Sequence, residues 1–423
     1  MTGNKSAPRG LLERWFQAAL KAVDPAVCVP PALPEPPPGR TVVVGAGKAA
    51  ARMAAAVERH WPGPLSGVVV TAYGHGEPCR TIGVREAGHP VPDAAGVAAT
   101  REILAAVDTA GPDDLVLVLL SGGGSSLLVS PVPGVTLEDK QALHRALLRS
   151  GAAISEINTV RRCLSQVKGG GLARRAAPAR VVTLVLSDVP GDDPSVVASG
   201  PTAVVSSAAE DAAAILQRYR IPLPDYPLKP LHGNDSEGYS ASTPAVEHRI
   251  VATAWDALEA AACAAREDGV EPLILGDALE GEAREVGRAL AGIALSCRRH
   301  GAPARTPCVL LSGGETTVTV RGRGHGGRNS ELALAMGVAL RGCEGIYVLA
   351  ADTDGIDGDG PHAGAFMGPE IWRAGVAAGL DGTARLADND SRGYFEAVDG
   401  LLVTGPTRTN VNDFRAVWVV SGC

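Results

Sequence analysis

The sequence predicts an α/β fold with two α/β domains, the first built on a parallel sheet and the second a mixed α/β domain. Short apolar strands alternate with helices of ten or more residues, and this alternation is typical of βαβ units. At 423 residues the chain is longer than a single hydrophobic core usually grows, which favours two domains. The 52 glycines can supply the many strand-to-helix turns of such a fold.

The first domain begins with an amphipathic helix predicted over residues 10–24, where apolar side chains recur at helical spacing. A proline-rich linker over residues 29–38 leads into the first strand. Strands are then predicted at 41–44, 67–72, 115–120 and 180–186, alternating with helices at 48–60, 93–107, 137–151 and 155–167. This pattern predicts an N-terminal Rossmann-like parallel sheet, which we place in a domain of residues 1–240.

The second domain follows a segment, residues 221–244, that is rich in proline, aspartate and serine and has no period. We interpret that segment as a linker or irregular excursion. Alternation then resumes with strands at 248–253, 272–275, 345–350 and 416–420, helices at 254–267, 281–300 and 329–340, and a hairpin over 308–321. These elements define a C-terminal domain of residues 241–423.

Composition narrows the class of partner. The net charge of −7 argues against a nucleic-acid surface, which needs a basic face. No N-terminal apolar segment indicates export, and no apolar run is long enough to span a bilayer. The eight cysteines form no CxxC pair, which favours free thiols in a reducing compartment. We therefore expect a cytoplasmic monomer or small homo-oligomer that acts on small molecules and binds neither nucleic acid nor membrane.

Two apolar runs in distant halves of the chain break into Ser-Gly-Gly. Such turns expose backbone N–H groups that can hold an anion, phosphate above all. The alternative is that similar strand ends simply need similar turns. If both turns bind, they predict an active site in the cleft between the two domains, with a phosphorylated ligand. The turns comprise Ser121, Gly122, Gly123, Gly124, Ser125 and Ser126 in the first half, and Ser312, Gly313, Gly314 and Glu315 in the second.

An earlier glycine turn looks like a dinucleotide fingerprint, because Gly45 and Gly47 follow an apolar strand. A nicotinamide site also needs an acid at the end of the second strand, where this chain has residues 71–73, Thr-Ala-Tyr. The turn is not a Walker A loop either, since the required first glycine and Ser/Thr are missing. Lys48 places a cation where the helix dipole favours an anion. The alternative is a tight turn with a solvent-exposed lysine.

Two acidic positions follow predicted strands, where ligands bind in open sheets. Asp188 stands directly after the strand at 180–186 and is a candidate general base or magnesium ligand. The loop after the strand at 345–350 offers Asp352, Asp354 or Asp357 to a magnesium ion that is also bound by phosphate oxygens. The alternative for both positions is an aspartate that caps a helix or forms a turn.

The stretch over residues 322–327 contains four glycines and ends at Arg328, the predicted start of a helix. Glycines let a backbone approach a ligand closely. The Arg328 guanidinium and the helix N-terminus are therefore predicted to converge on one phosphate. The alternative is a solvated hairpin.

Taken in order, these motifs resemble the glycerate 2-kinase family, the two-domain kinases with a C-terminal MOFRL region. The resemblance covers residues 10 to 420 and rests on the segments 45–50, 121–126, 156–161, 165–173, 187–189, 199–202, 312–315, 326–329, 353–355 and 405–411. The family pattern usually continues Asn-Val-Met-Asp-Leu near its end. Here residues 410–414 read Asn-Val-Asn-Asp-Phe, a departure that concerns strand packing more than chemistry.

The resemblance implies transfer of the γ-phosphoryl group of ATP, with Mg²⁺, to the 2-hydroxyl of D-glycerate, which gives 2-phosphoglycerate. It implies that Lys48 and Arg328 neutralise the transferred group, that Asp188 takes the substrate proton or binds magnesium, and that Asp354 shares the metal. It assigns the nucleotide phosphates to Gly45, Gly47, Ser121, Gly122, Gly123, Gly124, Ser125, Ser126, Gly313, Gly314, Glu315 and Asn329, and the substrate to Asn158, Lys168 and Asn410.

Two other functions stay open at this point. Some relatives have been labelled hydroxypyruvate reductases, which would make the first glycine turn an NAD(P) site. The missing acid after the second strand argues against that function. A non-catalytic protein that binds a phosphorylated metabolite would keep the glycine turns without needing Lys48 or Asp188.

Overall fold

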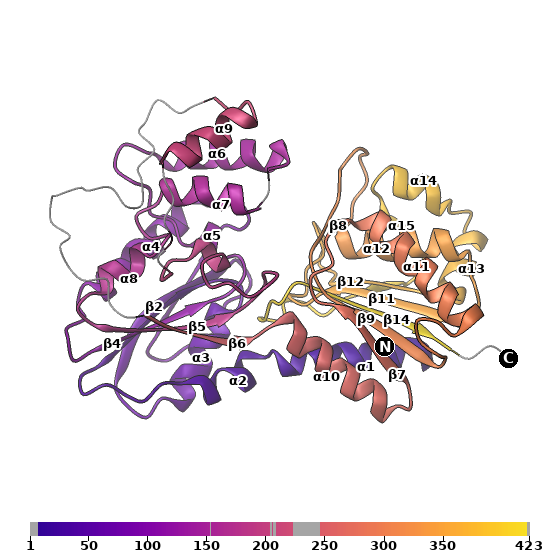
Figure 1. Cartoon of the computed structure of the whole chain (residues 1–423), viewed down its shortest axis with the longest axis horizontal. Coiled ribbons are helices and arrows are strands. Elements are labelled where there is room, and N and C mark those ends of the chain that lie inside the picture. Colours follow the sequence, from indigo (N-terminus) through magenta and orange to yellow (C-terminus); the bar gives the residue numbers. More distant parts are fainter. Residues whose placement is uncertain (1–6, 153, 204, 206–208, 223–245, 421–423) are drawn as a thin grey trace. The chain divides into compact units, whose positions relative to one another are not determined.

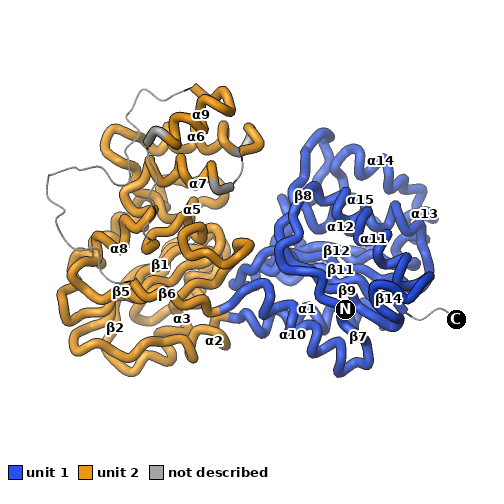
Figure 2. The backbone as a smooth tube through the Cα atoms, viewed as in Figure 1, with its two compact units in different colours: residues 1–24, 252–423 blue, residues 25–251 orange. Residues whose placement is uncertain are grey.

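The computed structural model describes residues 7–152, 154–203, 205, 209–222 and 246–420. Two compact units make up the chain (Figure 2). The N-terminal unit comprises residues 25–251, and the C-terminal unit combines residues up to 24 with those from 252 onward. Helix α1 (Ala7–Ala22) therefore packs with the C-terminal unit, although its sequence lies within the predicted domain of residues 1–240. The predicted border and most of the predicted linker lie outside the described residues.

The N-terminal unit is built on a six-stranded sheet in the order β3-β2-β1-β4-β5-β6. The pairs between β1 and its neighbours, β2 and β3, and β4 and β5 are parallel, which confirms the predicted parallel sheet. Since β2 and β4 flank β1, the winding of the chain reverses there, and ligands bind at such a switch point. The strands are β1 (Thr41–Ala46), β2 (Leu65–Ala72), β3 (Gly83–Ala87), β4 (Leu115–Leu120), β5 (Arg180–Leu186) and β6 (Val246–Ala252).

Strands β1 and β4 are buried along their whole length, as expected for parallel strands whose two faces are covered. Helices α3 (Ala50–His60) and α4 (Ala94–Val107) pack against this sheet. The Asp93 side chain accepts a hydrogen bond from Gly96 N and so fixes the start of α4. The remaining short helices are α2 (Pro25–Cys28), α5 (Gly124–Leu127) and α8 (Gly171–Ala176).

A separate helical layer belongs to the same unit. Helices α6 (Leu137–Ser150), α7 (Ile154–Cys163) and α9 (Ala209–Arg218) share their own apolar cluster, which includes Leu147, Val160 and Leu216 (Figure 1). A capping box at Thr136 and Asp139 starts α6. This layer matters for function because α6 and α7 lie next to the Ser-Gly-Gly-Gly-Ser-Ser turn after β4.

The C-terminal unit contains a mixed six-stranded sheet in the order β13-β12-β11-β14-β9-β7, as predicted. Strand β14 runs antiparallel to both β11 and β9, whereas β7 runs parallel to β9. The strands are β7 (Glu271–Gly276), β9 (Cys308–Ser312), β11 (Ile346–Asp352), β12 (Gly364–Met367), β13 (Leu401–Leu402) and β14 (Asp413–Val419).

Helices cover both faces of this second sheet. Helices α1 and α10 (Ala254–Glu267) pack together, with Phe16 of α1 against Phe414 of β14 at 5.3 Å between ring centroids. Helices α11 (Ala283–His300) and α12 (Arg328–Leu340) share a core with Val417, which points to the opposite face because side chains alternate along a strand. The outer helices are α13 (Pro369–Ala377), α14 (Gly382–Ala387) and α15 (Ser391–Ala397).

The predicted hairpin over residues 308–321 is wrong. Strand β9 pairs with β14 and β7, and the short β10 (Thr316–Thr317) pairs in parallel with β8 (Gly281–Glu282). The chain leaves the sheet at Gly314, whose φ is +107°, and a Cβ there would overlap the backbone of Leu279. The apolar periodicity cannot reveal that a strand one hundred residues later takes the place beside β9.

Among the described residues, no helix is both long enough and apolar enough to cross a membrane.

Candidate active site

The glycines of the first turn allow the end of β1 to approach the end of β4 closely. A Cβ at Gly45 would overlap the carbonyl of Leu119, and one at Gly47 would overlap Ser121. The backbone N–H groups of Gly47 and Lys48 donate to Val70 O and Gly122 O, at 3.1 and 2.8 Å. These donors are used inside the protein, so the turn does not present them to a pyrophosphate. Binding by Gly45 and Gly47 stays a prediction from the resemblance.

The turn after β4 keeps its donors available. The N–H groups of Gly122, Gly123 and Ser125 make no hydrogen bond within the described part of the chain. Gly123 adopts φ of +82°, and a Cβ there would lie 3.3 Å from Cγ of Lys48 and 2.9 Å from Cδ2 of His89. The Lys48 side chain therefore lies against this turn, as its predicted role in charge neutralisation requires. Gly124 is needed for packing, because a Cβ there would approach Ala46 O.

Asp188 lies where the sequence predicts, two residues beyond the last residue of β5. Its side chain is half-buried, and the preceding Ser187 is buried. The carboxylate is thus at the same edge of the sheet as the turns after β1 and β4, since parallel strands end together. A half-exposed carboxylate at this edge can accept a proton or bind a hydrated cation.

Beside the turn after β4 lies a cavity of about 40 Å³ lined by four nitrogen-containing side chains, Lys140, His144, Arg161 and Lys168. Its other lining residues are Pro92, Ser125, Ser126, Leu143, Leu147, Val160 and Leu164. His144 and Lys168 are buried, at 8% and 2% exposure. Among the described residues, none of the four forms an ion pair with a carboxylate, so the positive charge of Lys140, Arg161 and Lys168 is not compensated inside the cavity.

Hydrogen bonds tie this cavity to the turn. Lys168 Nζ donates to Ser125 O at 2.6 Å and to Leu128 O at 3.3 Å. Ser125 Oγ is 2.8 Å from Ser199 Oγ, which donates to Asn158 Oδ1 at 2.9 Å. Asn158 Oδ1 also accepts from Arg161 at 3.2 Å. The predicted substrate residues Asn158 and Lys168 therefore lie together, and Ser126 Oγ donates back to Gly123 O at 3.0 Å.

Electrostatics in the cavity disfavour positive charge. Burial, and then the charge of Arg161, lower the pKa of Lys140 to about 8. Burial and the neighbouring cations lower the pKa of His144 to about 4, so the ring is neutral near pH 7 and can accept from Arg161, whose Nη2 is 2.9 Å from Nδ1. The pKa of Lys168 falls well below its ordinary value for the same reasons. A bound anion would relieve this repulsion.

In the C-terminal unit, Arg328 stands at the start of α12 as predicted, but carboxylates surround its guanidinium. Nε donates to Asp413 and Nη2 to Asp352, each at 2.7 Å, and Nη1 lies 3.3 Å from Glu315. Asp413 is buried and also pairs with Arg415 at 2.5 Å. Burial by itself lowers the pKa of Arg328, but the three carboxylates raise it well above its ordinary value. The guanidinium is therefore permanently charged and rigidly held.

The N-terminus of α12 is already occupied by a carboxylate. Asp357 accepts from Asn329 N at 2.9 Å, from Ser330 N at 2.8 Å and from Ser330 Oγ at 2.7 Å. The predicted convergence of Arg328 and this helix N-terminus on one phosphate thus faces an internal competitor. Asn329 is buried, and its Nδ2 donates to Asp413 at 2.7 Å.

The glycines before Arg328 are explained by packing. A Cβ at Gly322 would overlap the backbone of Asp388, and one at Gly324 would overlap Asp390. A Cβ at Gly327 would overlap Asp357. These residues let the stretch approach the segment between α14 and α15, so their density gives no separate evidence for a ligand.

In the second Ser-Gly-Gly turn, some backbone groups are bonded within the protein and others are not. Gly313 N donates to Gly276 O at 2.9 Å, and Gly313 O accepts from Arg415 at 2.7 Å. The N–H groups of Gly314 and Glu315 make no hydrogen bond within the described residues, as a phosphate site would require. Glu315, however, adds a carboxylate to the Arg328 network, which opposes a phosphate.

The predicted metal ligands do not form a preformed metal site. No group of three or more His, Cys, Asp or Glu side chains arranged to hold a metal occurs among the described residues. Asp354 is buried, with Oδ1 accepting from Ile356 N at 2.8 Å, and it belongs to a different unit from Asp188. A shared metal stays a prediction. Asn410 is also buried, and its Oδ1 accepts from Asn412 N at 3.3 Å.

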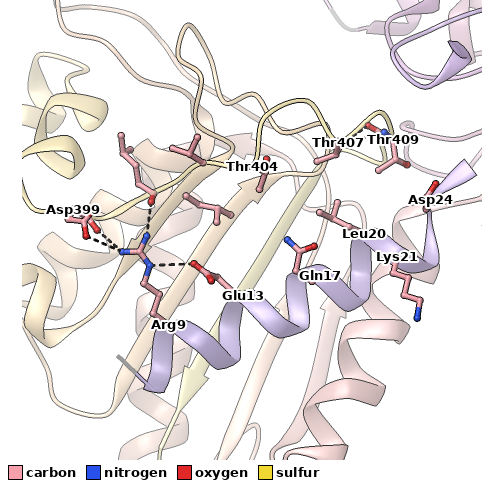
Figure 3. A pocket seen from close by; sticks show the side chains of 13 residues that line it. Arg9, Glu13, Gln17, Leu20, Lys21, Asp24, Asp399, Thr404, Thr407 and Thr409 are labelled. Carbon is pink, nitrogen blue, oxygen red and sulfur yellow. Dashed lines mark hydrogen bonds and ion pairs between the residues drawn. The ribbon is translucent and has the colours of Figure 1, made fainter. Parts of the chain in front are cut away.

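A groove of about 720 Å³ runs along α1 in the C-terminal unit (Figure 3). Arg9 spans its end, with guanidinium donors on Asp399 O at 2.6 Å and Leu401 O at 3.0 Å and with Glu13 at 3.5 Å. On the opposite wall, Thr409 Oγ1 donates to the carbonyl of Val23, the residue that follows α1, at 2.6 Å. This groove is lined by both carboxylates and basic side chains, whereas no carboxylate lines the cavity of the N-terminal unit.

Comparisons with known proteins identify the family to which the chain belongs. Residues 11–229 match the family described as a domain of unknown function, DUF4147, and residues 308–413 match the MOFRL family. A D-glycerate 2-kinase of Thermotoga maritima is 44% identical over 397 residues, which cover 93% of this chain and 94% of that protein. The chain belongs to the glycerate kinase family.

The crystal structure of a glycerate kinase from Thermotoga maritima has the same fold, with a TM-score of 0.85 at 40% identity over 98% of this chain and 100% of that one. A protein of Agrobacterium vitis with the provisional name hydroxypyruvate reductase is 54% identical over 99% of this chain and 96% of its own length. The family predicted from the motifs is confirmed. The name of the Agrobacterium vitis protein corresponds to the alternative function, a hydroxypyruvate reductase.

The sequence analysis does not single out three residues of the cationic cavity, nor Asp413, one of the three carboxylates that pair with Arg328. Lys140 and His144 are four residues apart and share one face of α6, a spacing that was available but is common on any helix. Arg161 lies within a segment that carried the resemblance without an assigned role. Asp413 and Arg415 are two apart on β14, and only the strand pairing brings them to Arg328.

Proposed function

We propose that this glycerate kinase family member transfers the γ-phosphoryl group of ATP to the 2-hydroxyl of D-glycerate. The observation that carries the proposal is the turn after β4, which combines free N–H groups, the Lys48 side chain and a cavity with uncompensated positive charge. Phosphoryl transfer depends on positioning and charge neutralisation, and these groups supply both. The glycerate kinases among the relatives support the choice of substrate.

In this proposal Lys48 neutralises charge on the transferred group, and the N–H groups of Gly122, Gly123 and Ser125 hold phosphate oxygens. Asp188 accepts the proton of the attacking hydroxyl or binds magnesium. Its half-buried carboxylate fits Mg²⁺, which keeps several waters and needs only one or two protein carboxylates with the phosphates. The ion would neutralise phosphate charge when bound. The resemblance also assigns charge neutralisation to Arg328, whose guanidinium already pairs with three carboxylates.

Mg²⁺, ATP as the donor, the cytoplasmic location and a monomer or small homo-oligomer are parts of this proposal that rest on the sequence and the resemblance. On the same basis we propose that nucleotide phosphates are contacted by Gly313, Gly314, Glu315 and Asn329. The substrate is contacted by Asn410. The carboxylates around Arg328 make that second set the weaker partner for an anion.

The alternative reductase is tested by one pair of assays on the same preparation. With hydroxypyruvate and NADH we expect no change in absorbance, because the N–H groups of the first glycine turn are used internally and no acid follows β2. With D-glycerate, ATP and Mg²⁺ we expect ADP release that depends on glycerate. NADH oxidation without phosphoryl transfer would contradict the proposal, and absence of both would favour a binding protein.

A further inference from the structure

The cavity beside the turn after β4 is lined by basic side chains that have no part in the charge neutralisation proposed for Lys48. Lys140, Arg161 and Lys168 line it together with the neutral ring of His144, and most of the remaining wall is apolar, with Ser125 and Ser126 of the turn on one side. Within the described residues no carboxylate pairs with any of these groups. Lys168 is buried, and Lys140 and Arg161 are half-buried. Cations removed from water are costly unless a counter-ion is present, so the cavity suits an anion that the described residues do not supply.

The size of the cavity selects a small anion. Its volume of about 40 Å³ accommodates about three water-sized groups, which is the size of a carboxylate. The wall formed by Leu143, Leu147, Val160 and Leu164 suits an anion attached to a short carbon chain better than a fully hydrated ion.

Donors remain for such an anion. Lys140 Nζ makes one hydrogen bond, a 3.3 Å contact with Leu164 O, so two of its three N–H groups are unassigned. Arg161 is oriented on one side by His144 and on the other by Asn158, and keeps further N–H groups beyond these bonds. His144 is a positioning residue, because its neutral ring holds the guanidinium of Arg161.

We propose that this cavity binds the carboxylate of the acceptor substrate, a short-chain 2-hydroxy acid, through Lys140, Arg161 and Lys168, and thereby selects the hydroxyl that is phosphorylated. This inference rests on the proposed function. In a 2-hydroxy acid the reactive oxygen is on the carbon next to the carboxylate, so a fixed carboxylate leaves that hydroxyl little freedom. A 3-hydroxyl is one bond further away and is not fixed in the same way.

The place of the cavity supports this selection. The short turn at residues 121–126 has Lys48 against Gly123 on one side and Lys168 Nζ on the carbonyl of Ser125 on the other. A substrate whose carboxylate enters the cavity therefore has its neighbouring hydroxyl at the turn that carries the phosphate donors. The other source of an anion, a phosphate of the nucleotide, would bind the same cations, and the experiment must distinguish the two.

The test compares Lys140→Met with Arg145→Met, a control on the same helix that removes an equal charge from an exposed side chain outside the cavity. At saturating Mg-ATP, Lys140→Met should raise KM for D-glycerate about 10- to 100-fold, as expected for the loss of a hydrogen bond to a charged group. KM for ATP should change less than about twofold. Arg145→Met should leave both constants near wild type.

Thermal melts provide a second readout that does not depend on turnover. Without substrate, Lys140→Met should melt at or above the wild-type temperature, because it removes an uncompensated charge. D-glycerate should raise the melting temperature of wild type, glycerol at the same concentration should not, and the glycerate shift should be lost in the variant. A lower melting temperature without substrate would mean that Lys140 is structural and would overturn the proposal.

The failures of the two proposals are distinguishable. If wild type does not phosphorylate glycerate, the proposed function fails. If wild type is active but Lys140→Met keeps its KM for glycerate, or raises KM for ATP instead, the function stands and the carboxylate subsite is wrong. A raised KM for ATP would mean that the cavity binds a nucleotide phosphate instead.

Discussion

The two Ser-Gly-Gly turns look alike in sequence but differ in their electrostatic surroundings. The turn at residues 121–126 lies beside Lys140, Arg161 and Lys168, with no carboxylate among the described residues to balance them. The turn at residues 312–315 lies beside Arg328 and Arg415, which three carboxylates already neutralise. Both turns keep free N–H groups. The first turn therefore lacks an anion, whereas the second is internally neutralised.

The difference teaches that a glycine turn by itself does not identify an anion site. The same strand-to-turn geometry accommodates close packing, as at Gly45, Gly47 and Gly314, where a Cβ would overlap neighbouring backbone or side-chain atoms. Charge balance around the turn decides which one needs a ligand. We therefore expect substitutions near the first turn to change activity most, and substitutions in the second network to change stability as well.

The largest effect is expected for Lys48→Ala. The side chain lies half-buried against Gly123 and contributes little packing, so the fold should persist while kcat falls by about 100-fold or more, as when one charge-stabilising donor is removed. Steady-state kinetics and a thermal melt of the same variant check both halves of this expectation. Near-normal turnover would remove Lys48 from the mechanism.

A smaller loss is expected for Arg328→Lys. Lysine keeps the charge but cannot bridge Asp413, Asp352 and Glu315 at once, so we expect kcat/KM for glycerate to fall about tenfold or more. Arg323→Lys is the matched control, because Arg323 is an exposed residue of the same glycine-rich stretch. Equal losses in the two variants would mean that the position of Arg328 has no special role.

Asp357→Ala tests whether the second network is chiefly structural. The substitution removes the carboxylate that accepts from Asn329 N and Ser330 N at the start of α12, and should destabilise the protein by about 2 kcal/mol. Denaturant melts measure this loss. Asp359→Ala, in the same loop but at an exposed carboxylate, should cost less than about 0.5 kcal/mol. A stable Asp357→Ala protein would reopen this helix N-terminus as a ligand site.

The smallest effect concerns acid stability. The pKa of His144 is about 4 in the folded protein, lowered by burial and nearby cations, and about 6.5 when unfolded. Between these values the unfolded state binds more protons, so stability falls as the pH drops from 6.5 toward 4. His144→Gln should therefore lose less melting temperature than wild type between pH 7 and pH 5. An equal loss in both proteins would show that the ring is not held neutral.

Most of the fold can be predicted from the sequence because strands, helices and the turns between them are encoded in short segments. The alternation of strands and helices, the parallel first sheet and the position of Lys48, Asp188 and Arg328 at strand or helix ends all follow from short segments. The partners of those residues do not. Asp413 reaches Arg328 only because β14 inserts between β9 and β11, and Asp357 reaches α12 only through a loop that folds back on the helix.

The cationic cavity could not be predicted for a similar reason. Lys140 and Lys168 are 28 positions apart in sequence, and only the packing of α6 and α7 against the turn after β4 places both in one cavity. What the sequence does not reveal is the absence of a carboxylate beside them. That absence, within the described residues, separates the two turns.

The most direct test of the account is the position of the phosphate in the product. Phosphorus NMR of the wild-type reaction with D-glycerate, ATP and Mg²⁺, referenced to authentic 2- and 3-phosphoglycerate, identifies it without a coupling enzyme. A fixed carboxylate beside the turn at residues 121–126 predicts 2-phosphoglycerate as the product. Formation of 3-phosphoglycerate, or no phosphorylated product at all, would contradict the account.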